Sequence, residues 1–508
     1  MATIRLTGRA SALSRWQMEI VRRKIETVMP GLKVELVPRT SRGDQLKDIP
    51  LHTVEGTDFF TREIIETLER GEADLAVHSL KDMSSAHFFG DHHFAVVDRE
   101  DTHDIALLRS GWEEKVSRGE PITIGTCSPR REEMALDFLQ KALPQQSLPV
   151  QIKSKPIRGN VETRLRKLHL GEYDGTILAA AGLNRLWPEI EEAMKQYGFI
   201  RIVLPLLDCV PAPCQGAIVV EALPNADNAS GLLEAINDEQ IWEDAVREKM
   251  TGLRYGQGCL QRFGVTTIYY NGEKTTYAAG RDESGMTFSH FSKLPDPDWK
   301  GKTIFSSTDH MRSFYDYSFF PAPDLIKEPV VYVANYKSLS DPRHGEDWVN
   351  LLSHKRVWAA GSKTWFELAG KGIQVEGCAD ALGLESLIPL WEKPVLQIKK
   401  EEVLVLTHAK AAGHWMEKGW KTAITHQLIP RYVPEIAQAI READVVFWTS
   451  KGQYEIYQRE LKPDVIHACP FGETAQQLKQ AGLAPVVFPT IKSFIQWRRS
   501  SSPSVNAG

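Results

Sequence analysis

The sequence has few cysteines, little net charge and no long apolar run. Its six cysteines form no Cys-x-x-Cys pair, which is typical of a reducing compartment rather than a disulfide framework. The formal charge of −5 at pH 7 argues against general nucleic-acid binding, which needs a basic surface. No stretch approaches transmembrane length, and the N-terminus lacks the apolar core of a signal peptide. We therefore expect a cytoplasmic protein with no membrane or nucleic-acid partner.

Metal-ligating patterns are also scarce. Cys209 and Cys214 are the closest pair of cysteines, but prolines separate them and no histidine nearby would complete a zinc site. His92 and His93, in Gly-Asp-His-His-Phe, are interpreted as residues of a solvated loop. The sequence therefore predicts no metal site.

Strand-like and helix-like segments alternate along the first half of the chain. The pattern predicts strands at 4–8, 34–38 and 74–79 and helices at 11–29 and 60–70. Such alternation is typical of a parallel, doubly wound α/β sheet. A second unit of this kind begins near residue 121 and includes a strand at 175–181. Near residue 263, short alternating strands around Asn271-Gly272 predict a hairpin in a small α+β domain.

Three of the predicted strands end in a turn that carries arginine and then opens a helix. In one of them, Ser128 is a natural N-cap and Pro129 fits the first helical position. Arg130 and Arg131 then fall in the first turn, where the helix dipole disfavours cations. A bound anion would explain this placement, whereas the alternative is a set of solvated surface arginines. The other two turns carry Arg9, Arg158 and Arg164.

Two further segments carry chemically useful side chains. Ser79-Leu80-Lys81-Asp82 follows a buried strand, at the strand end where ligands bind in open α/β sheets; the alternative is that Asp82 only caps a helix or pairs with Lys81. Cys259 lies in a glycine-rich turn. An exposed thiol there is a candidate nucleophile or attachment point, and the alternative is an ordinary loop residue.

The C-terminal part of the chain nearly repeats itself. The run from Val357 to Gly361, with Thr364 after it, resembles the run from Val465 to Gly472, with Thr474 after it. Each threonine lies eight residues before another glycine. Two related α/β lobes are the simplest interpretation. The run Gly-Ser-Lys-Thr in the first lobe lacks the glycine order of a nucleotide-binding P-loop.

The first part of the chain resembles porphobilinogen deaminase, also called hydroxymethylbilane synthase. That family has two doubly wound domains like those of periplasmic binding proteins and a small third domain. The resemblance rests on several motifs in the same order, namely Arg9-Ala10-Ser11-Ala12-Leu13, Ala76-Val77-His78-Ser79-Leu80-Lys81-Asp82, Gly125-Thr126-Cys127-Ser128-Pro129-Arg130-Arg131, Arg158-Gly159-Asn160-Val161-Glu162-Thr163-Arg164, Ala181-Gly182-Leu183-Asn184-Arg185-Leu186, Gln215-Gly216-Ala217 and Gly258-Cys259.

The resemblance implies a function for these residues. Cys259 would hold a dipyrromethane cofactor through a thioether, and Asp82 would be the catalytic carboxylate. Porphobilinogen and the growing linear tetrapyrrole carry many carboxylates, which bidentate guanidinium groups bind well. The implied cofactor- and substrate-binding residues are Arg9, Ser11, Ser79, Lys81, Ser128, Arg130, Arg131, Arg158, Arg164, Arg185 and Gln215.

Residues 41–58 form a polar stretch that is interpreted as a mobile loop or lid. The sequence departs from the family pattern there, because Thr57 replaces the usual lysine.

The last part of the chain resembles uroporphyrinogen-III synthase more weakly. Asp444-Val445-Val446-Phe447-Trp448-Thr449-Ser450 is similar to a strand of that family, and the Gly-x-x-Thr repeats are similar to its lobe motifs. Thr449, Ser450 and Thr474 are the implied site residues. A fused cyclase would receive hydroxymethylbilane before it closes spontaneously to the wrong isomer.

The sequence therefore predicts an α/β protein with a bilobal α/β module at its C-terminal end. The expected domains are 1–103 with 215–235, then 104–214, then 236–315, then 325–500. We expect a monomer. The alternatives are a deaminase with a degenerate cyclase-like tail and a non-catalytic binding protein for a polycarboxylate.

Overall fold

The computed structural model describes residues 3–40, 61–145, 148–256, 261–270, 273–311, 313–380 and 382–501. Two compact units emerge from its contacts. The first consists of residues 1–267, 276–290 and 390–397, and the second of residues 268–275, 291–389 and 398–508. No helix among the described residues is both long and apolar enough to cross a membrane.

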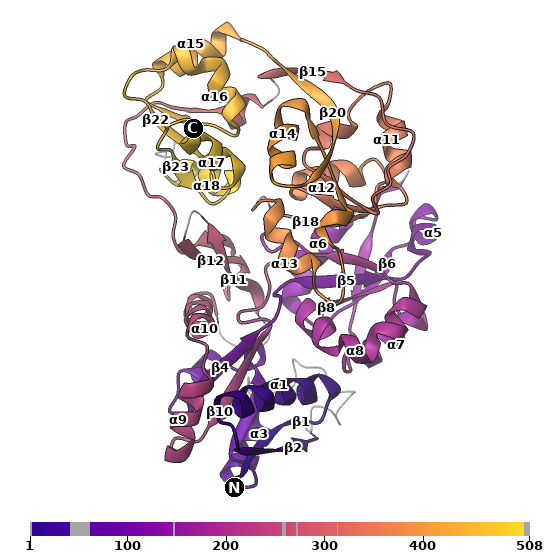
Figure 1. Cartoon of the computed structure of the whole chain (residues 1–508), viewed down its shortest axis with the longest axis vertical. Coiled ribbons are helices and arrows are strands. Elements are labelled where there is room, and N and C mark those ends of the chain that lie inside the picture. Colours follow the sequence, from indigo (N-terminus) through magenta and orange to yellow (C-terminus); the bar gives the residue numbers. More distant parts are fainter. Residues whose placement is uncertain are drawn as a thin grey trace. The chain divides into compact units, whose positions relative to one another are not determined.

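The first sheet of the N-terminal unit has the order β2-β1-β3-β10-β4 (Figure 1). Its strands are β1 (Thr3–Arg9), β2 (Lys33–Arg39), β3 (Leu75–Ser79), β4 (His93–Arg99) and β10 (Ala217–Ala222). The helices connected with it are α1 (Ala12–Val28), α3 (Arg62–Glu69), α4 (Ser85–Phe88), α9 (Asp227–Ile236) and α10 (Glu239–Gly252), and η2 (Leu80–Asp82) is a short 3-10 turn. Helices α1 and α9 bury Met18, Val21 and Leu232 against apolar side chains of the strands. Each such side chain stabilises the fold by about 1.5–3 kcal/mol.

The second sheet of this unit has the order β7-β6-β8-β5-β9. Its strands are β5 (Asp104–Leu108), β6 (Ile122–Gly125), β7 (Ile152–Lys155), β8 (Gly175–Ala179) and β9 (Ile200–Val203). The helices are α5 (Trp112–Ser117), α6 (Pro129–Ala142), α7 (Val161–His169) and α8 (Ala180–Tyr197). The strand predicted at 175–181 ends earlier, because Ala180 already begins α8.

The two doubly wound α/β domains are therefore confirmed, but neither sheet is wholly parallel. β10 runs antiparallel to β3 and β4, and β5 runs antiparallel to β8 and β9. Each of these strands enters its sheet directly after the chain has crossed from the other sheet. Gly216 lies at one crossing with a φ of +86°, and a Cβ there would meet the carbonyl oxygen of Glu100 at 2.2 Å. The crossing segments therefore pack backbone to backbone.

The small sheet that follows has the order β11-β12-β13. Its strands are β11 (Arg262–Tyr270), β12 (Glu273–Arg281) and β13 (Thr287–Phe291). The predicted pairing of β11 with β12 is confirmed, and the turn residues Asn271 and Gly272 lie outside the described residues.

Residues 390–397 belong to the first unit although they come from far along the chain. Lys393 forms an ion pair with Glu100 at 2.6 Å. The N–H of Val395 donates to Asn184 Oδ1 at 3.2 Å, and Arg201 donates to the carbonyl oxygen of Val395 at 2.9 Å. This segment is therefore attached beside a crossing segment of the two sheets.

The second unit contains two more sheets, ordered β14-β21-β22-β23 and β15-β20-β19-β16-β17-β18. Their strands are β14 (Ile304–Ser306), β15 (Tyr315–Phe319), β16 (Val330–Val333), β17 (Arg356–Ala359), β18 (Val375–Cys378), β19 (Val403–His408), β20 (Lys421–Pro430), β21 (Val445–Phe447), β22 (Ile466–Pro470) and β23 (Val486–Phe488). The helices are α11 (Gly345–Leu352), α12 (Ser362–Ala369), α13 (Ile388–Trp391), α14 (Ala409–Glu417), α15 (Pro434–Glu442), α16 (Lys451–Tyr457), α17 (Glu473–Gln480) and α18 (Ile491–Ser501).

The sequence repeat corresponds to the same strand–turn–helix unit in both sheets. β17 leads into α12, which carries Thr364, and β22 leads into α17, which carries Thr474. Gly372 and Gly482 follow the two helices with φ of +79° and +83°, a conformation that favours glycine.

Candidate active site

The ends of β1 and β3 place the first group of predicted site residues. These neighbouring strands are parallel, so Arg9 and the segment that follows Ser79 leave the same edge of the sheet. Ser11 caps α1 by accepting from a backbone N–H at 3.4 Å. Ser79 Oγ accepts from Gln17 Nε2 at 2.8 Å. Asp82 ends the short turn η2 and is half-buried.

The predicted helix starts are also found at α6 and α7. Ser128 caps α6 and accepts from the N–H of Arg131 at 3.4 Å, with Pro129 at the first helical position. Asn160 caps α7 in the same way at 3.0 Å. Arg158 lies half-buried in the loop that leads to this cap.

Arg130 and Arg131 have an anionic partner within the protein. Arg130 donates to Asp104 Oδ2 at 2.8 Å and to the carbonyl oxygen of Val210 at 2.6 Å. Arg131 donates to both carboxylate oxygens of Asp104, at 2.7 and 3.2 Å, and to the carbonyl oxygen of Ile177 at 3.0 Å. Burial raises the pKa of Asp104, but the two guanidinium groups outweigh it and hold that pKa well below its usual range. The anion that offsets the unfavourable helix position is therefore Asp104.

Arg164 and Lys81 lack such a partner. Arg164 donates to the carbonyl oxygen of Gly159 at 2.9 Å, and neither cation forms an ion pair with a carboxylate among the described residues. Burial lowers the pKa of Arg164 to about 10, and the charge of Arg131 adds to this, while Asp82 opposes it. Burial also lowers the pKa of Lys81, which Asp82 likewise opposes. Within the described residues, these two half-buried cations therefore have the charge of Asp82 acting on them but no carboxylate in an ion pair.

Arg185 and Gln215 lie at the crossing between the two sheets. Gln215 is fully buried and donates to Asp104 Oδ1 at 3.0 Å. Arg185 donates to Asp98 Oδ2 and to the carbonyl oxygen of Gly216, both at 2.7 Å. Both side chains therefore hold the crossing segments together in this structure.

Cys259 and the predicted lid at 41–58, with Thr57, lie outside the described residues.

Sequence reasoning missed two buried acids that organise this region. One is Asp104, and the other is Glu248, which accepts from Arg99 at 2.9 Å and from the backbone N–H groups of Cys214 and Thr267 at 2.7 and 2.8 Å. Asp104 stands at the start of an apolar strand-like run, Asp-Ile-Ala-Leu-Leu, and an acid in such a run is rarely buried without a cation. That signal was available in the sequence.

The interpretation of His92 as a solvated loop residue is wrong. Its Nδ1 lies 2.5 Å from an oxygen of Glu221, which is fully buried. His93 is not a loop residue either, because it begins strand β4; its ring makes an exposed contact at 3.1 Å with the carbonyl oxygen of Pro224.

In the second unit, the structure brings Thr449, Ser450 and Thr474 together. Thr474 Oγ1 donates to the carbonyl oxygen of Thr449 at 3.0 Å. The N–H of Thr449 donates to Ser307 Oγ at 3.0 Å, and Ser450 caps α16. Tyr315, which sequence reasoning missed, hydrogen-bonds with Ser450. Burial raises the pKa of Tyr315 to about 12, and that bond opposes part of the rise.

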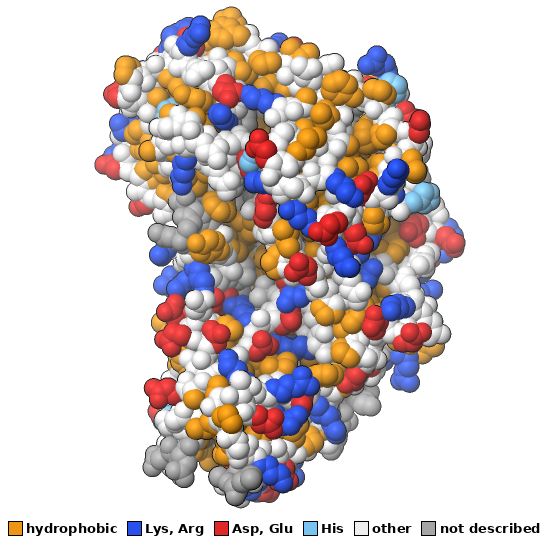
Figure 2. Space-filling model, viewed as in Figure 1, with side chains coloured by type: hydrophobic (Ala, Val, Ile, Leu, Met, Phe, Trp, Pro, Cys, Tyr) orange, Lys and Arg blue, Asp and Glu red, His pale blue; other side chains and the backbone are white. Residues whose placement is uncertain are grey.

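Acidic and basic side chains are interspersed over the face drawn in Figure 2.

Residues 4–230 match the family profile described as "Porphobilinogen deaminase, dipyromethane cofactor binding domain". The porphobilinogen deaminase of Burkholderia orbicola is 34% identical over 280 residues, which cover 55% of this chain and 78% of that protein. The enzyme of Laribacter hongkongensis is 32% identical over 259 residues, covering 51% of this chain and 78% of that protein.

Solved structures similar to this chain include an ancestral arginine-binding protein bound to arginine and YhfZ from Shigella flexneri. Both have a TM-score of 0.27, at 12% and 14% identity, and both cover 50% of this chain. The alignments span 99% and 92% of those two chains, respectively.

The identity over most of the length of the relatives, with the match to the cofactor-binding profile, shows that this chain belongs to the porphobilinogen deaminase family.

Proposed function

We propose that residues 1–315 join four porphobilinogen molecules into hydroxymethylbilane with release of ammonia. The observation that carries this proposal is a pair of half-buried cations, Arg164 and Lys81, that form no ion pair with a carboxylate among the described residues and that feel the charge of Asp82. Each porphobilinogen unit carries an acetate and a propionate, so a growing chain supplies the negative charge that these cations lack. The proposed domains are 1–103 with 215–235, then 104–214, then 236–315.

The residues present fit a dipyrromethane cofactor. Its carboxylates match the charges of Arg164 and Lys81, which form no ion pair within the described part of the chain, and Ser11, Ser79 and Ser128 offer hydroxyls at the same helix starts and strand ends. When bound, the cofactor supplies a covalently held two-ring primer to which further pyrrole units are added. We propose Cys259 as its attachment point.

Asp82 is proposed to accept hydrogen bonds from pyrrole N–H groups and to stabilise positive charge that develops when ammonia leaves. Its carboxylate stands after a strand end, in a turn that packs Leu80 into the core, so its position is held by the fold. Arg9, Arg158 and Arg185 are proposed to bind further carboxylates, and Arg130, Arg131 and Gln215 to support the site from Asp104.

The test is the consumption of porphobilinogen by purified wild-type chain and by the Asp82→Asn variant, with the linear product trapped by oxidation to uroporphyrin. We expect turnover by the wild type and a turnover at least about 100-fold slower by the variant. A wild-type chain that binds porphobilinogen without consuming it would instead support a non-catalytic binding protein. The proposal takes the enzyme as a cytoplasmic monomer.

For residues 325–500, we propose cyclisation of hydroxymethylbilane to uroporphyrinogen III. Three hydroxyl-bearing side chains support this: Thr449 and Ser450 after one strand, and Tyr315 hydrogen-bonded to Ser450. Such neutral groups can hydrogen-bond the carboxylates and pyrrole N–H groups of a tetrapyrrole.

The isomer ratio of the product separates the bifunctional enzyme from a deaminase with a degenerate tail. We expect type III product from the wild type and a shift toward type I in the Tyr315→Phe variant, which keeps the ring and loses the hydroxyl. Type I product alone from the wild type would contradict the cyclase.

A further inference from the structure

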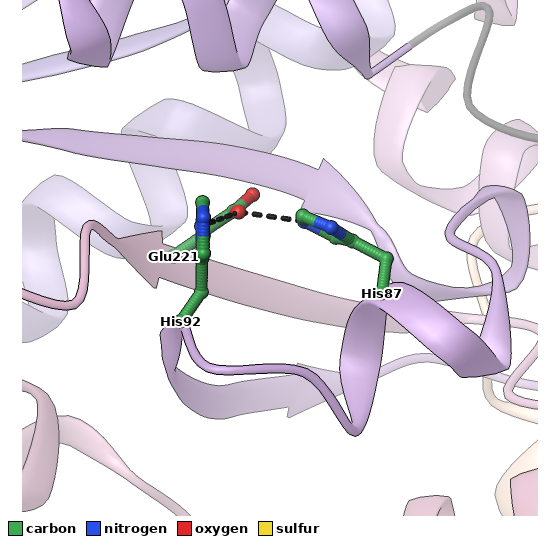
Figure 3. A group of neighbouring side chains, drawn as sticks. All are labelled: His87, His92 and Glu221. Atoms are coloured by element: carbon green, nitrogen blue, oxygen red, sulfur yellow. Dashed lines mark hydrogen bonds and ion pairs between the residues drawn. The ribbon is translucent and has the colours of Figure 1, made fainter.

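Three histidines converge on one buried carboxylate in the first unit, away from the residues assigned above. His87 Nε2 and His92 Nδ1 lie 2.7 and 2.5 Å from Glu221 Oε1, and His78 Nε2 lies 2.9 Å from Glu221 Oε2. Figure 3 shows the Glu221 oxygen between the rings of His87 and His92. The group comes from β3, α4, the turn before β4 and β10.

The cluster has buried polar atoms whose hydrogen-bonding capacity is unused. Glu221 is fully buried and His78 is 6% exposed. His78 Nε2 and Glu221 Oε2 lie 2.9 Å apart, and neither atom has a further hydrogen-bond partner among the described residues. The second oxygen, Glu221 Oε1, faces His87 and His92.

The charge of the buried Glu221 carboxylate also favours a bound cation. The ion pairs of Glu221 within the described residues are all with histidines, so no lysine or arginine neutralises it there. A fully buried carboxylate is stabilised by a cation beside it. A divalent cation bound by Glu221 and the imidazoles would supply that charge.

We propose that His87, His92 and Glu221 bind one zinc ion, while His78 holds the second oxygen of the Glu221 carboxylate. Two imidazole nitrogens and one carboxylate oxygen, with a water as the fourth ligand, form a tetrahedral donor set that zinc accepts, with bonds of about 2.0–2.2 Å. The donor atoms of His87, His92 and Glu221 all lie within 4.8 Å of one another. Tetrahedral zinc spaces its ligand atoms by about 3.3 Å, so small side-chain rotations suffice.

Neighbouring packing orients two of the rings. Phe94 stacks on His92, with ring centroids 6.3 Å apart, and meets the edge of His87 at 5.7 Å. Such outer contacts hold ligand rings in place around a metal.

The proposed zinc would be structural. His78 precedes the turn that carries Asp82, and His87 and His92 follow it. The ion would hold His87 and His92 on Glu221 of β10, and Glu221 in turn contacts His78 on the other side of the turn. The proposed role of the ion is to position this turn.

The test measures the zinc content of the full chain after dialysis against zinc chloride and removal of free metal. We expect one zinc per wild-type chain and loss of most of it in the double variant His87→Ala/His92→Ala. The matched control is His93→Ala, which removes the neighbouring histidine and should keep the zinc. Wild type without stoichiometric zinc, or a double variant that keeps it, would overturn the proposal.

Cobalt substitution of the wild type provides a measurement that needs no variant. Co²⁺ in a tetrahedral site of nitrogen and oxygen ligands absorbs strongly in the visible range without a thiolate charge-transfer band. We expect that spectrum, and we expect zinc to raise the unfolding temperature of the first unit by about 5 °C. A thiolate band or an octahedral spectrum would overturn the assignment. Because these readouts do not use activity, their failure is separate from failure of the deaminase proposal.

Discussion

Arg130 and Arg131 on α6 differ from Arg164 on α7 in what neutralises their charge. The first two share the buried carboxylate of Asp104, whereas Arg164 has a backbone carbonyl as its hydrogen-bond partner and a pKa lowered by burial. Sequence motifs treat all three alike, as cations at helix starts. The difference separates arginines that hold the fold from an arginine available to a ligand, because a buried cation with its own counter-ion has less to gain from another anion.

The largest expected effect is the loss of turnover when the Asp82 carboxylate is removed. Asp82→Asn keeps the shape of the side chain but removes its charge, so we expect turnover of porphobilinogen to fall by about 100- to 10,000-fold. Stability should change little, since Asp82 is only half-buried. Steady-state kinetics beside a denaturation curve measure both. Asp91→Asn, at an exposed acid of the same unit, is the control. Equal turnover in both variants would remove Asp82 from the mechanism.

The shared counter-ion should matter most for stability. Asp104→Asn leaves Arg130 and Arg131 buried without their anion, and we expect the free energy of unfolding to fall by about 3–5 kcal/mol. Urea denaturation of the variant measures the loss. The control is Asp137→Asn, which changes an exposed acid on α6, the helix that carries the two arginines. A loss below 1 kcal/mol would mean that the two arginines are not held by Asp104.

In the second unit, burial lowers the pKa of a histidine, as it lowers the pKa of Arg164 in the first unit. Burial lowers the pKa of His426 to about 4, and nearby His408 and Lys337 add to the shift. The folded-state pKa lies below the unfolded value of 6.5, so the unfolded chain takes up a proton first as the pH falls. The stabilisation by neutral His426 is complete above pH 6.5 and is lost progressively toward pH 4, by about 3 kcal/mol in total.

Thermal unfolding of the wild type and of His426→Gln between pH 7 and pH 4.5 checks this expectation. The variant should lose less stability on acidification than the wild type, and His354→Gln, at an exposed ring of the same unit, should follow the wild type. Parallel curves for all three proteins would contradict it.

Arg164 should contribute to substrate binding and contribute little to the free energy of unfolding. Arg164→Gln removes a charge that has no carboxylate partner among the described residues, so we expect kcat/KM for porphobilinogen to fall by about ten- to a hundred-fold. The free energy of unfolding should stay constant or rise. Arg166→Gln, on an exposed face of the same helix, should change neither. A strong loss of stability in Arg164→Gln would place this residue with Arg130 and Arg131.

Local signals in the sequence predict much of the fold. Residues 4–8, 34–38 and 74–79 are strands β1, β2 and β3 within one or two residues, and the cap at Ser128 is present. Apolar periodicity and capping are local, so a single sequence carries them. The direction of β10 and β5 is not local, because it depends on how the chain crosses between sheets.

The pairings within the site could not be predicted in the same way. Asp104 contacts arginines 26 and 27 positions away, and Glu221 contacts His87 and His92 across more than a hundred positions. Such contacts depend on strand order and register, which no local pattern specifies. A buried acid at the start of an apolar run predicts that a cation is needed, but not which one.

Intact mass under denaturing conditions tests the central claim most directly. Wild type and Cys259→Ala would be incubated with porphobilinogen and then unfolded. The account predicts a covalent adduct on the wild type alone, extending in steps of one pyrrole unit. An unmodified wild type that leaves porphobilinogen unconsumed would contradict the assignment of the first unit as a working deaminase.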